Sequence, residues 1–321
     1  MHSPTARIAV SICTYDRYDL LPKAIESVTR QSIPPEEYRI LVVDNSPDHK
    51  RAHAIGKRFG EVPNLTYIVE ETPGLSNARN VSARECGTEM IAFMDDDAVA
   101  SPAWLEEIVK TFDSFGADAA IVGGRVDPIW GASRPSWLHD SMLGNLSVVN
   151  WGGETRVADA KEWFAGTNIS FRTQQILDHG GFATNLGRIG SGASLLSNEE
   201  IHLVEQIRKV GGKLIYAPAA YVNHLVDTRR LTRAWFRKRS AWQAVSDFMM
   251  DPKRYSGDVS VYWKETTKYF NSLPPAERTI RGLVYDTDDP GVFLWQIGAT
   301  YMMTIMALAG YDGVPSDAHK S

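Results

Sequence analysis

Five consecutive apolar residues, Met90-Ile-Ala-Phe-Met94, run directly into three acids, Asp95, Asp96 and Asp97. A short apolar run that ends at a turn signal is typical of a strand buried within a parallel sheet. Three unpaired carboxylates cannot be buried, because the desolvation of a charge without a partner is too costly. Either the acids form a solvated turn, or Asp95 and Asp97 bind a divalent cation together with phosphate oxygens. This segment alone does not decide between the two interpretations.

Strand and helix patterns alternate through the first 126 residues. Apolar runs predict strands over 7–14, 38–43, 65–69, 90–94 and 119–126, with amphipathic helices between them. This alternation predicts an α/β fold with a mostly parallel sheet and helices on both faces, in which ligands bind at the carboxyl ends of the strands. Four polar clusters lie at such ends, and we expect them to share one nucleotide site: Thr14 to Arg17, Asp44 with Asn45, Gly74 to Asn80, and Asp95 to Asp97.

The middle of the chain is more irregular. Residues 128–162 contain several Trp, Pro and Gly residues and are expected to form a long loop over the site. A strand over 162–171 is expected to return to the sheet, and residues 185–193 form a glycine-rich loop that suits either a mobile lid or a linker. A helix begins near residue 198, followed by a short strand over 213–217 and a segment over 221–224 that reaches back toward the site.

The C-terminal part, from residue 227 onward, is expected to be mostly helical and is locally basic in a chain of formal net charge −5. Residues 290–311 contain no charged residue. A stretch of about 20 such residues is long enough to cross a membrane. Its Gln, Thr and small residues favour instead a helix that is buried, forms a dimer or dips into a membrane surface.

Composition excludes several classes of protein. The negative net charge speaks against a nucleic-acid partner, and two cysteines within predicted regular elements speak against a disulfide framework and fit a reducing cytoplasm. The first seven residues lack a signal-peptide pattern. The chain also lacks a dinucleotide-binding glycine fingerprint, a Walker A sequence and a nucleophile elbow, which argues against the corresponding enzyme classes.

The polar clusters suit a nucleoside diphosphate and a metal ion. Asp44 can accept a hydrogen bond from a base N–H, and Tyr15 can supply an aromatic face. Arg17 and Arg79 can contact base or phosphate oxygens. Asp95 and Asp97 can hold a divalent cation across two phosphates, with His224 either as a third ligand or as a structural residue. Glu200 or Glu199, in the first turn of a helix, can serve as general base.

Four sequence blocks resemble glycosyltransferase family 2, the inverting nucleotide-sugar transferases of the GT-A fold. They are Ser11-Ile-Cys-Thr-Tyr-Asp-Arg17, Val42-Val-Asp44-Asn-Ser46, Gly74-Leu-Ser-Asn-Ala-Arg79-Asn80 and Phe93-Met-Asp95-Asp-Asp97. Three later stretches also resemble the family: Gly166 to Arg172 its acceptor-side strand, Leu196 to Leu203 its catalytic-base segment, and Tyr216 to His224 the stretch that ends in a metal-binding His. The resemblance covers about residues 6–245.

The resemblance implies a single displacement at the anomeric carbon of a nucleoside-diphosphate sugar, by default a UDP-sugar. Glu200 would be the base, although this position is commonly Asp and Glu199 stays an alternative. Mn²⁺ or Mg²⁺ would bind Asp97 with Asp95 and His224. The nucleotide-sugar site would comprise Thr14, Tyr15, Arg17, Asp44, Asn45, Arg79, Asp95 and Asp96. Acceptor or phosphate contacts are expected from Trp163, Gly166, Asn168, Arg230 and Arg233, although the two arginines also suit a solvated helix or an anionic membrane.

These inferences divide the chain into a GT-A catalytic domain over 1–226 and a helical extension over 227–321. The nucleotide-binding half is expected over 6–126 and the acceptor-binding half over 127–226. The expected acceptor is a saccharide or lipid-linked saccharide, used in surface polysaccharide or glycolipid assembly in the cytoplasm or at the inner face of the membrane. A membrane contact and a homodimer are both open for the extension. The alternatives are a sugar nucleotidyltransferase and a non-catalytic carbohydrate-binding protein.

Overall fold

A computed structural model of the chain describes residues 6–188, 190, 194–255, 264, 267, 268 and 270–310. The chain forms two compact units. Unit 1 comprises residues 1–129, 147–193 and 199–226, and unit 2 comprises residues 130–146, 194–198 and 227–321. Each unit is described by itself.

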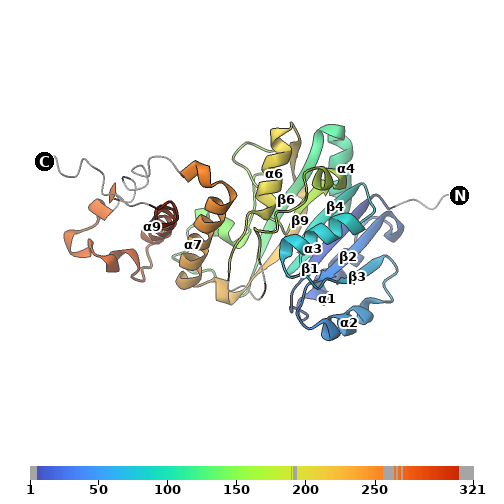
Figure 1. Cartoon of the computed structure of the whole chain (residues 1–321), viewed down its shortest axis with the longest axis horizontal. Coiled ribbons are helices and arrows are strands. Elements are labelled where there is room, and N and C mark those ends of the chain that lie inside the picture. Colours follow the sequence, from blue (N-terminus) through green and yellow to red (C-terminus); the bar gives the residue numbers. More distant parts are fainter. Residues whose placement is uncertain are drawn as a thin grey trace. The chain divides into compact units, whose positions relative to one another are not determined.

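One sheet organises unit 1, with the strand order β3-β2-β1-β4-β8-β6-β9-β5 and β7 paired to β9 (Figure 1). The pairs β1–β2, β1–β4 and β2–β3 are parallel, as predicted. The strand β8 is antiparallel to both β4 and β6, and β9 is antiparallel to β5 and β7. The strands are β1 Ile8–Thr14, β2 Tyr38–Asp44, β3 Leu65–Val69, β4 Met90–Asp95, β5 Ala98–Ala100, β6 Ala119–Trp130, β7 Arg156–Val157, β8 Ile169–Arg172 and β9 Lys213–Val226.

The later strands differ from the sequence-based expectation. The strand expected over 162–171 is reduced to the four residues of β8, and the strand expected over 213–217 extends to the fourteen residues of β9. The short strand β5 was not anticipated, because three residues between an acidic turn and a helix carry too little pattern. The sheet is therefore mixed, with its parallel part formed by the strands that the sequence identified best.

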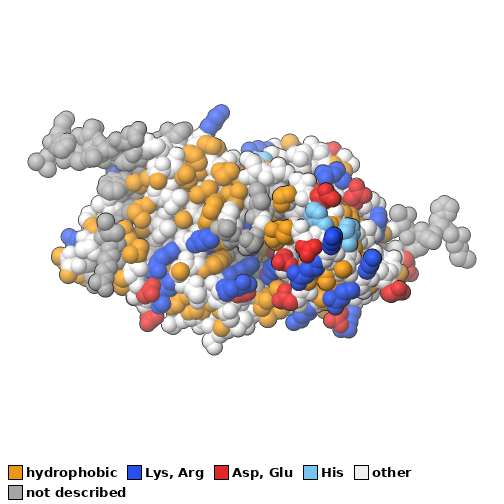
Figure 2. All heavy atoms as spheres, turned by 60° about the horizontal axis from the view of Figure 1, so that its bottom comes forward, with side chains coloured by type: hydrophobic (Ala, Val, Ile, Leu, Met, Phe, Trp, Pro, Cys, Tyr) orange, Lys and Arg blue, Asp and Glu red, His pale blue; other side chains and the backbone are white. Residues whose placement is uncertain are grey.

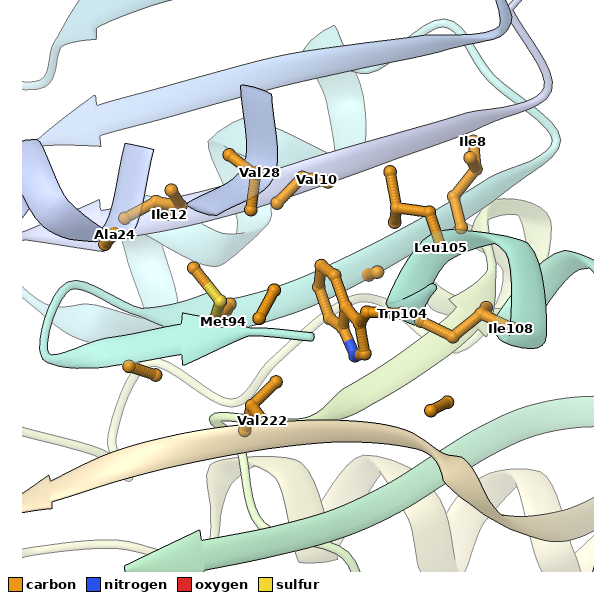
Figure 3. Close-up of a cluster of buried hydrophobic side chains, with 14 of the residues drawn as sticks. Ile8, Val10, Ile12, Ala24, Val28, Met94, Trp104, Leu105, Ile108 and Val222 are labelled. Carbon is orange, nitrogen blue, oxygen red and sulfur yellow. The ribbon is translucent and has the colours of Figure 1, made fainter. Parts of the chain in front are cut away.

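Helices cover both faces of the sheet because the central strands carry apolar side chains on both faces. In β1, Ile8, Val10 and Ile12 face one cluster with Trp104 of α4, whereas Ala9 faces the other (Figure 3). The second cluster is built around three phenylalanines, Phe93, Phe171 and Phe182. The helices of unit 1 are α1 Leu21–Thr29, α2 His49–Gly56, α3 Leu75–Glu85, α4 Trp104–Phe115, α5 Thr173–Asp178 and α6 Glu199–Lys209, with 3-10 turns at Pro35–Glu37, Lys57–Phe59 and Gly116–Asp118.

Unit 2 is built around two long helices, α7 Arg233–Met250 and α9 Pro290–Leu308, which contact each other. Phe236 of α7 lies edge-on to Phe293 of α9, and Trp137 packs on both rings. The Ser240 hydroxyl donates to the Ile297 carbonyl at 2.7 Å. The 3-10 turns here are Asp140–Leu146, Thr228–Arg230, Pro252–Tyr255, Pro275–Glu277 and Ile280–Leu283.

The helix α9 confirms the helix expected near residues 290–311, of which residue 311 lies outside the described part. It is long and apolar enough to cross a membrane. Only 28% of its most apolar 18-residue window is buried inside the protein. Buried Gln296 donates from Nε2 to the carbonyls of Gly282 and Tyr285, so its amide is satisfied inside unit 2. A helix of this composition with a largely uncovered surface is unusual in water.

Candidate active site

The acidic triplet lies where the strand β4 ends and the short strand β5 begins. Asp95 is the last residue of β4 and its side chain is 35% exposed, whereas the Asp97 side chain is 1% exposed. The register of β5 and β9 places Ala98 opposite His224, so that His224 Nε2 lies 3.3 Å from Asp97 Oδ1. One ligand atom each from Asp95, Asp97 and His224 lies within 4.8 Å of the others.

This group of atoms suits a divalent cation. Two carboxylate oxygens and one imidazole nitrogen are ligands that Mn²⁺ accepts readily, and Mg²⁺ favours the oxygens. The buried carboxylate of Asp97 and the 2% exposed His224 offer their ligand atoms from the interior, whereas Asp95 offers its own from the solvent side. The three predicted ligands are therefore close enough to bind one ion.

A basic side chain already balances part of the triplet. Arg17 Nη1 lies 2.9 Å from Asp96 Oδ1, and Arg17 Nη2 lies 2.6 Å from Asp97 Oδ2. The Thr14 hydroxyl donates to the other oxygen of Asp96 at 2.7 Å. Burial raises the pKa of Asp96 to about 7, and the Arg17 guanidinium opposes this shift. In this structure Arg17 and Thr14 thus contact the acids, and a role for them toward a nucleotide stays a prediction.

The end of β2 carries a second buried carboxylate, Asp44, which is 0% exposed. It accepts hydrogen bonds from the hydroxyls of Tyr18 at 2.9 Å and Tyr67 at 2.5 Å, and from the backbone N–H and the hydroxyl of Ser46. A base N–H would therefore have to replace or join one of these donors. Sequence reasoning missed both tyrosines, because each lies in an ordinary strand or loop pattern and only the fold brings them to Asp44.

Asn45 connects two chain segments beside this carboxylate. Its Nδ2 donates to the carbonyls of Glu70 at 2.9 Å and Thr72 at 2.6 Å, and its Oδ1 accepts from Gly74 N–H at 2.5 Å. The half-buried Tyr15 lies one residue beyond β1 on the same rim. Asn45 therefore fixes the start of α3, whereas Tyr15 presents part of its surface to solvent.

Arg79 lies among the carboxylates rather than at an open surface. It is 3% exposed, and its Nη1 donates to Glu199 Oε1 at 2.8 Å. Asp95 Oδ1 lies 3.8 Å from Nη2 and Glu200 Oε2 lies 4.0 Å from Nη1. One guanidinium thus links the metal-binding edge to both candidate bases. A contact between Arg79 and a nucleotide stays a prediction.

The two candidate bases differ in their surroundings. The Glu199 side chain is 5% exposed and ion-paired to Arg79, whereas the Glu200 side chain is 16% exposed. Within the described residues, Glu200 Oε2 has no hydrogen-bond partner. Burial and the neighbouring Glu199 charge raise the pKa of Glu200 to about 8, and Arg79 lowers it. The Glu200 side chain is therefore the more exposed of the two acids near Arg79.

Three predicted acceptor residues lie on the segment that leads into β8. Asn168 is 1% exposed, accepts from Trp104 Nε1 at 2.9 Å, and donates to the carbonyls of Arg125 and Ala220 at 2.9 Å each. Both polar atoms of its amide are thus bonded inside the protein, and a direct contact of Asn168 with an acceptor stays a prediction. Trp163 is partly buried against Trp151, with ring centroids 6.3 Å apart.

Gly166 has a steric function. A Cβ atom at this position would lie 2.3 Å from Arg79 Nη2, so only glycine leaves room for the guanidinium. The segment expected to bind an acceptor therefore also leaves the space that the Arg79 guanidinium occupies.

The remaining two predicted residues, Arg230 and Arg233, belong to unit 2. Arg233 Nε donates to the Thr287 carbonyl at 3.0 Å, its Nη2 lies 2.5 Å from Asp288 Oδ1, and its guanidinium lies over the Trp137 ring at 5.1 Å. Arg230 is half-buried in the turn that precedes α7. Contacts of either residue with an acceptor or a phosphate stay predictions.

The family model of glycosyl transferase family 2 matches residues 9–174. This chain belongs to glycosyltransferase family 2. The glucosyl-dolichyl phosphate glucuronosyltransferase of Haloferax volcanii is 31% identical over 265 residues, which are 81% of this chain and 82% of the relative. The succinoglycan biosynthesis protein ExoM of Rhizobium meliloti is 25% identical over 241 residues, which are 74% of this chain and 73% of that protein.

Solved structures confirm the GT-A fold of this family 2 enzyme. The mannosyltransferase PcManGT from Pyrobaculum calidifontis, in complex with GDP-Man and Mn²⁺, superposes with a TM-score of 0.54 at 18% identity, covering 98% of this chain and 78% of that chain. TarS 1-349 of S. aureus, in complex with UDP, gives a TM-score of 0.53 at 17% identity, covering 95% and 91%. The predicted family, fold and nucleotide-sugar transferase class are thereby confirmed.

Proposed function

We propose that this glycosyltransferase moves a sugar from a nucleoside diphosphate, with UDP as the default, to a hydroxyl of a saccharide or lipid-linked saccharide, with inversion at the anomeric carbon. The observation that carries the proposal is one group of side chains at the strand ends. The atoms of Asp95, Asp97 and His224 lie within 4.8 Å of one another, and Arg79 joins Asp95 to the glutamates at distances of 4.0 Å or less. A cation site beside a buried base is the arrangement that this reaction requires.

Glu200 acts as the general base. Its Oε2, which has no hydrogen-bond partner within the described residues, accepts the proton of the acceptor hydroxyl, whose oxygen forms a bond to the anomeric carbon as the bond to the donor diphosphate breaks. A raised pKa suits this task, because a base with an ordinary carboxylate pKa takes a proton from a hydroxyl less readily near neutral pH. Attack from the face opposite the leaving group inverts the configuration.

Asp95, Asp97 and His224 hold the divalent cation, for which Mn²⁺ fits the mixed oxygen and nitrogen ligands best. When bound, the ion supplies positive charge against the departing diphosphate. Arg17 orients Asp97 through its 2.6 Å contact. The PcManGT complex with GDP-Man and Mn²⁺ supports a metal-dependent enzyme of this kind.

A lipid-linked acceptor is supported by the name of the Haloferax volcanii relative, which acts on a dolichyl phosphate sugar. Unit 2 is suited to contact the bilayer that would hold such an acceptor. Residues 227–254 contain eight Lys and Arg against three Asp, and α9 contains no charged residue over its nineteen positions. Figure 2 shows hydrophobic side chains interspersed with Lys and Arg in the part of the view that includes unit 2. This combination suits an anionic membrane surface.

Two experiments test these proposals. Purified protein is incubated with UDP-, GDP- and dTDP-sugars, a saccharide or polyprenyl-phosphate sugar acceptor and Mn²⁺, and nucleoside diphosphate release and the product's anomeric configuration are measured. Glu200→Gln should abolish transfer and Asp97→Ala should strongly reduce it at a fixed Mn²⁺ concentration, while Glu205→Gln, on the same helix as Glu200, should leave it unchanged. Flotation with vesicles of anionic and of neutral lipid should recover the protein with the anionic vesicles. Recovery as a dimer without vesicle binding would favour a second subunit as the partner of α9.

A further inference from the structure

Arg79 lies close to three carboxylates, one at the end of β4 and two in the first turn of α6. The side chains of Arg79 and Glu199 are 4% and 5% exposed, so their 2.8 Å contact is a buried ion pair. Glu200, at 4.0 Å from the same Nη1, is the next acid, and Asp95 lies 3.8 Å from Nη2. The hydrogen bond to Glu199 therefore occupies Nη1 and leaves Glu200 outside hydrogen-bond distance.

The position of Arg79 is fixed by more than its charge partner. Its guanidinium carbon lies 5.8 Å from the ring centre of Phe93 and 5.6 Å from that of Phe182. Gly166 leaves space for Nη2 that no other residue type would leave. Because Arg79 is held by rings and backbone, the choice between Glu199 and Glu200 depends on small side-chain movements of the two acids, which are adjacent in the first turn of α6.

We propose that Glu199 is a positioning residue, which engages Arg79 so that the neighbouring Glu200 stays free of a hydrogen-bonded cation and acts as a strong base. The proposal rests on the proposed role of Glu200 as the base. It also assigns different functions to two acids that sequence reasoning could not distinguish. In this arrangement Glu199 neutralises the buried arginine, and Glu200 receives the proton of the acceptor hydroxyl.

The charges around Glu200 predict how each substitution acts. Glu199 on the same helix repels a second negative charge, Arg79 on α3 attracts it, and Asp95 at the end of β4 offsets part of the Arg79 charge. Without the Glu199 charge, Glu200 no longer has a negative charge beside it. Arg79, which has then lost its closest partner, attracts Glu200 more strongly. Opposite charges within about 4–6 Å lower a carboxyl pKa by about 1–3 units. Without Arg79, the two acids face each other and the pKa of Glu200 rises.

The experiment measures kcat/KM for sugar transfer against pH at saturating Mn²⁺, in the full chain and in five variants, of which Glu200→Gln tests the base itself. Glu199→Gln should move the acidic limb of the profile to lower pH by about 1–3 units and reduce the maximum rate, because a weaker base is formed. Arg79→Gln should move the limb to higher pH. The double variant Arg79→Gln with Glu199→Gln should lie between them, and it replaces a buried ion pair by two neutral amides, which folds tolerate well. Glu205→Gln is the matched control on α6.

The outcomes separate the two levels of the proposal. If Glu200→Gln is inactive and Glu199→Gln keeps the wild-type limb, the positioning role is wrong while the base stands. If Glu200→Gln retains transfer, the assignment of the base itself is wrong. A purely structural role for Glu199 would lower the midpoint of thermal unfolding without moving the limb, and would also overturn the proposal. If Arg79→Gln does not fold, the comparison of Glu199→Gln with the double variant decides.

Discussion

The variant Asn168→Ala tests whether Asn168 supports the fold or contacts the acceptor. Replacing it by Ala removes three hydrogen bonds: one from Trp104 Nε1 and one each to the carbonyls of Arg125 and Ala220, all at 2.9 Å. A net hydrogen bond contributes about 1 kcal/mol, and an indole N–H left buried without a partner costs about 1–3 kcal/mol more. Unit 1 should therefore lose about 4–6 kcal/mol in its free energy of unfolding, since the 0% exposed Trp104 cannot turn toward water.

This loss corresponds to a decrease of about 10 °C in the midpoint of thermal unfolding. Circular dichroism melts and urea titrations of both proteins measure it. Asn77→Ala is the matched control, because its Nδ2 donates one exposed hydrogen bond to the Thr72 carbonyl, and it should change stability by about 0.5 kcal/mol at most. An Asn168→Ala protein with wild-type stability and a raised acceptor KM would refute the structural interpretation and restore Asn168 as an acceptor contact.

Three further predictions concern the active site. Asp97→Ala should raise the Mn²⁺ concentration for half-maximal transfer by at least about tenfold in a metal titration of activity, because it removes a predicted ligand; an unchanged titration would exclude Asp97 as a ligand. In wild-type protein, kcat/KM should rise about tenfold per pH unit up to about pH 8 and then level off, because Glu200 must lose its proton before it can act as base; a profile flat from pH 6 to 9 would contradict this. Gly166→Ala should displace Arg79 and lower the free energy of unfolding by about 3 kcal/mol in urea titrations, whereas Gly153→Ala, which has open space around its position, should change it little.

The parallel half of the fold could be predicted because its information is local. Each of β1, β2 and β4 is a continuous apolar run followed by a polar cluster, and parallel strands in register bring those clusters together: Thr14 lies opposite Asp44, and Cys13 lies opposite Asp95. The candidate ligands Asp95 and Asp97 and the residues expected on the nucleotide side lie in such clusters.

The contacts between side chains could not be predicted in the same way. The hydrogen bonds of Arg79 with Glu199 and of Asn168 with Trp104 depend on packing between segments far apart in the chain. A polar residue in a family motif looks the same in sequence whether it touches a ligand or supports the residues that do. Hydrogen-bond capacity separates the two cases, since an amide whose polar atoms are all bonded internally is not available to a substrate.

The metal site depends on the unpredicted part of the fold. His224 is the twelfth residue of β9, and its position beside Asp97 follows from the antiparallel pairing of β9 with β5, in which Ala98 lies opposite His224 and Ala100 opposite Val222. Successive side chains of a strand point to opposite faces, so a shift of one residue in this register would turn His224 away from the acids. The Leu225 N–H donates to the Asp97 carbonyl at 2.9 Å and continues the same pairing past the end of β5. The short strand β5, too weak in sequence to be predicted, thus fixes the register that brings His224, the candidate third ligand, to the two carboxylates.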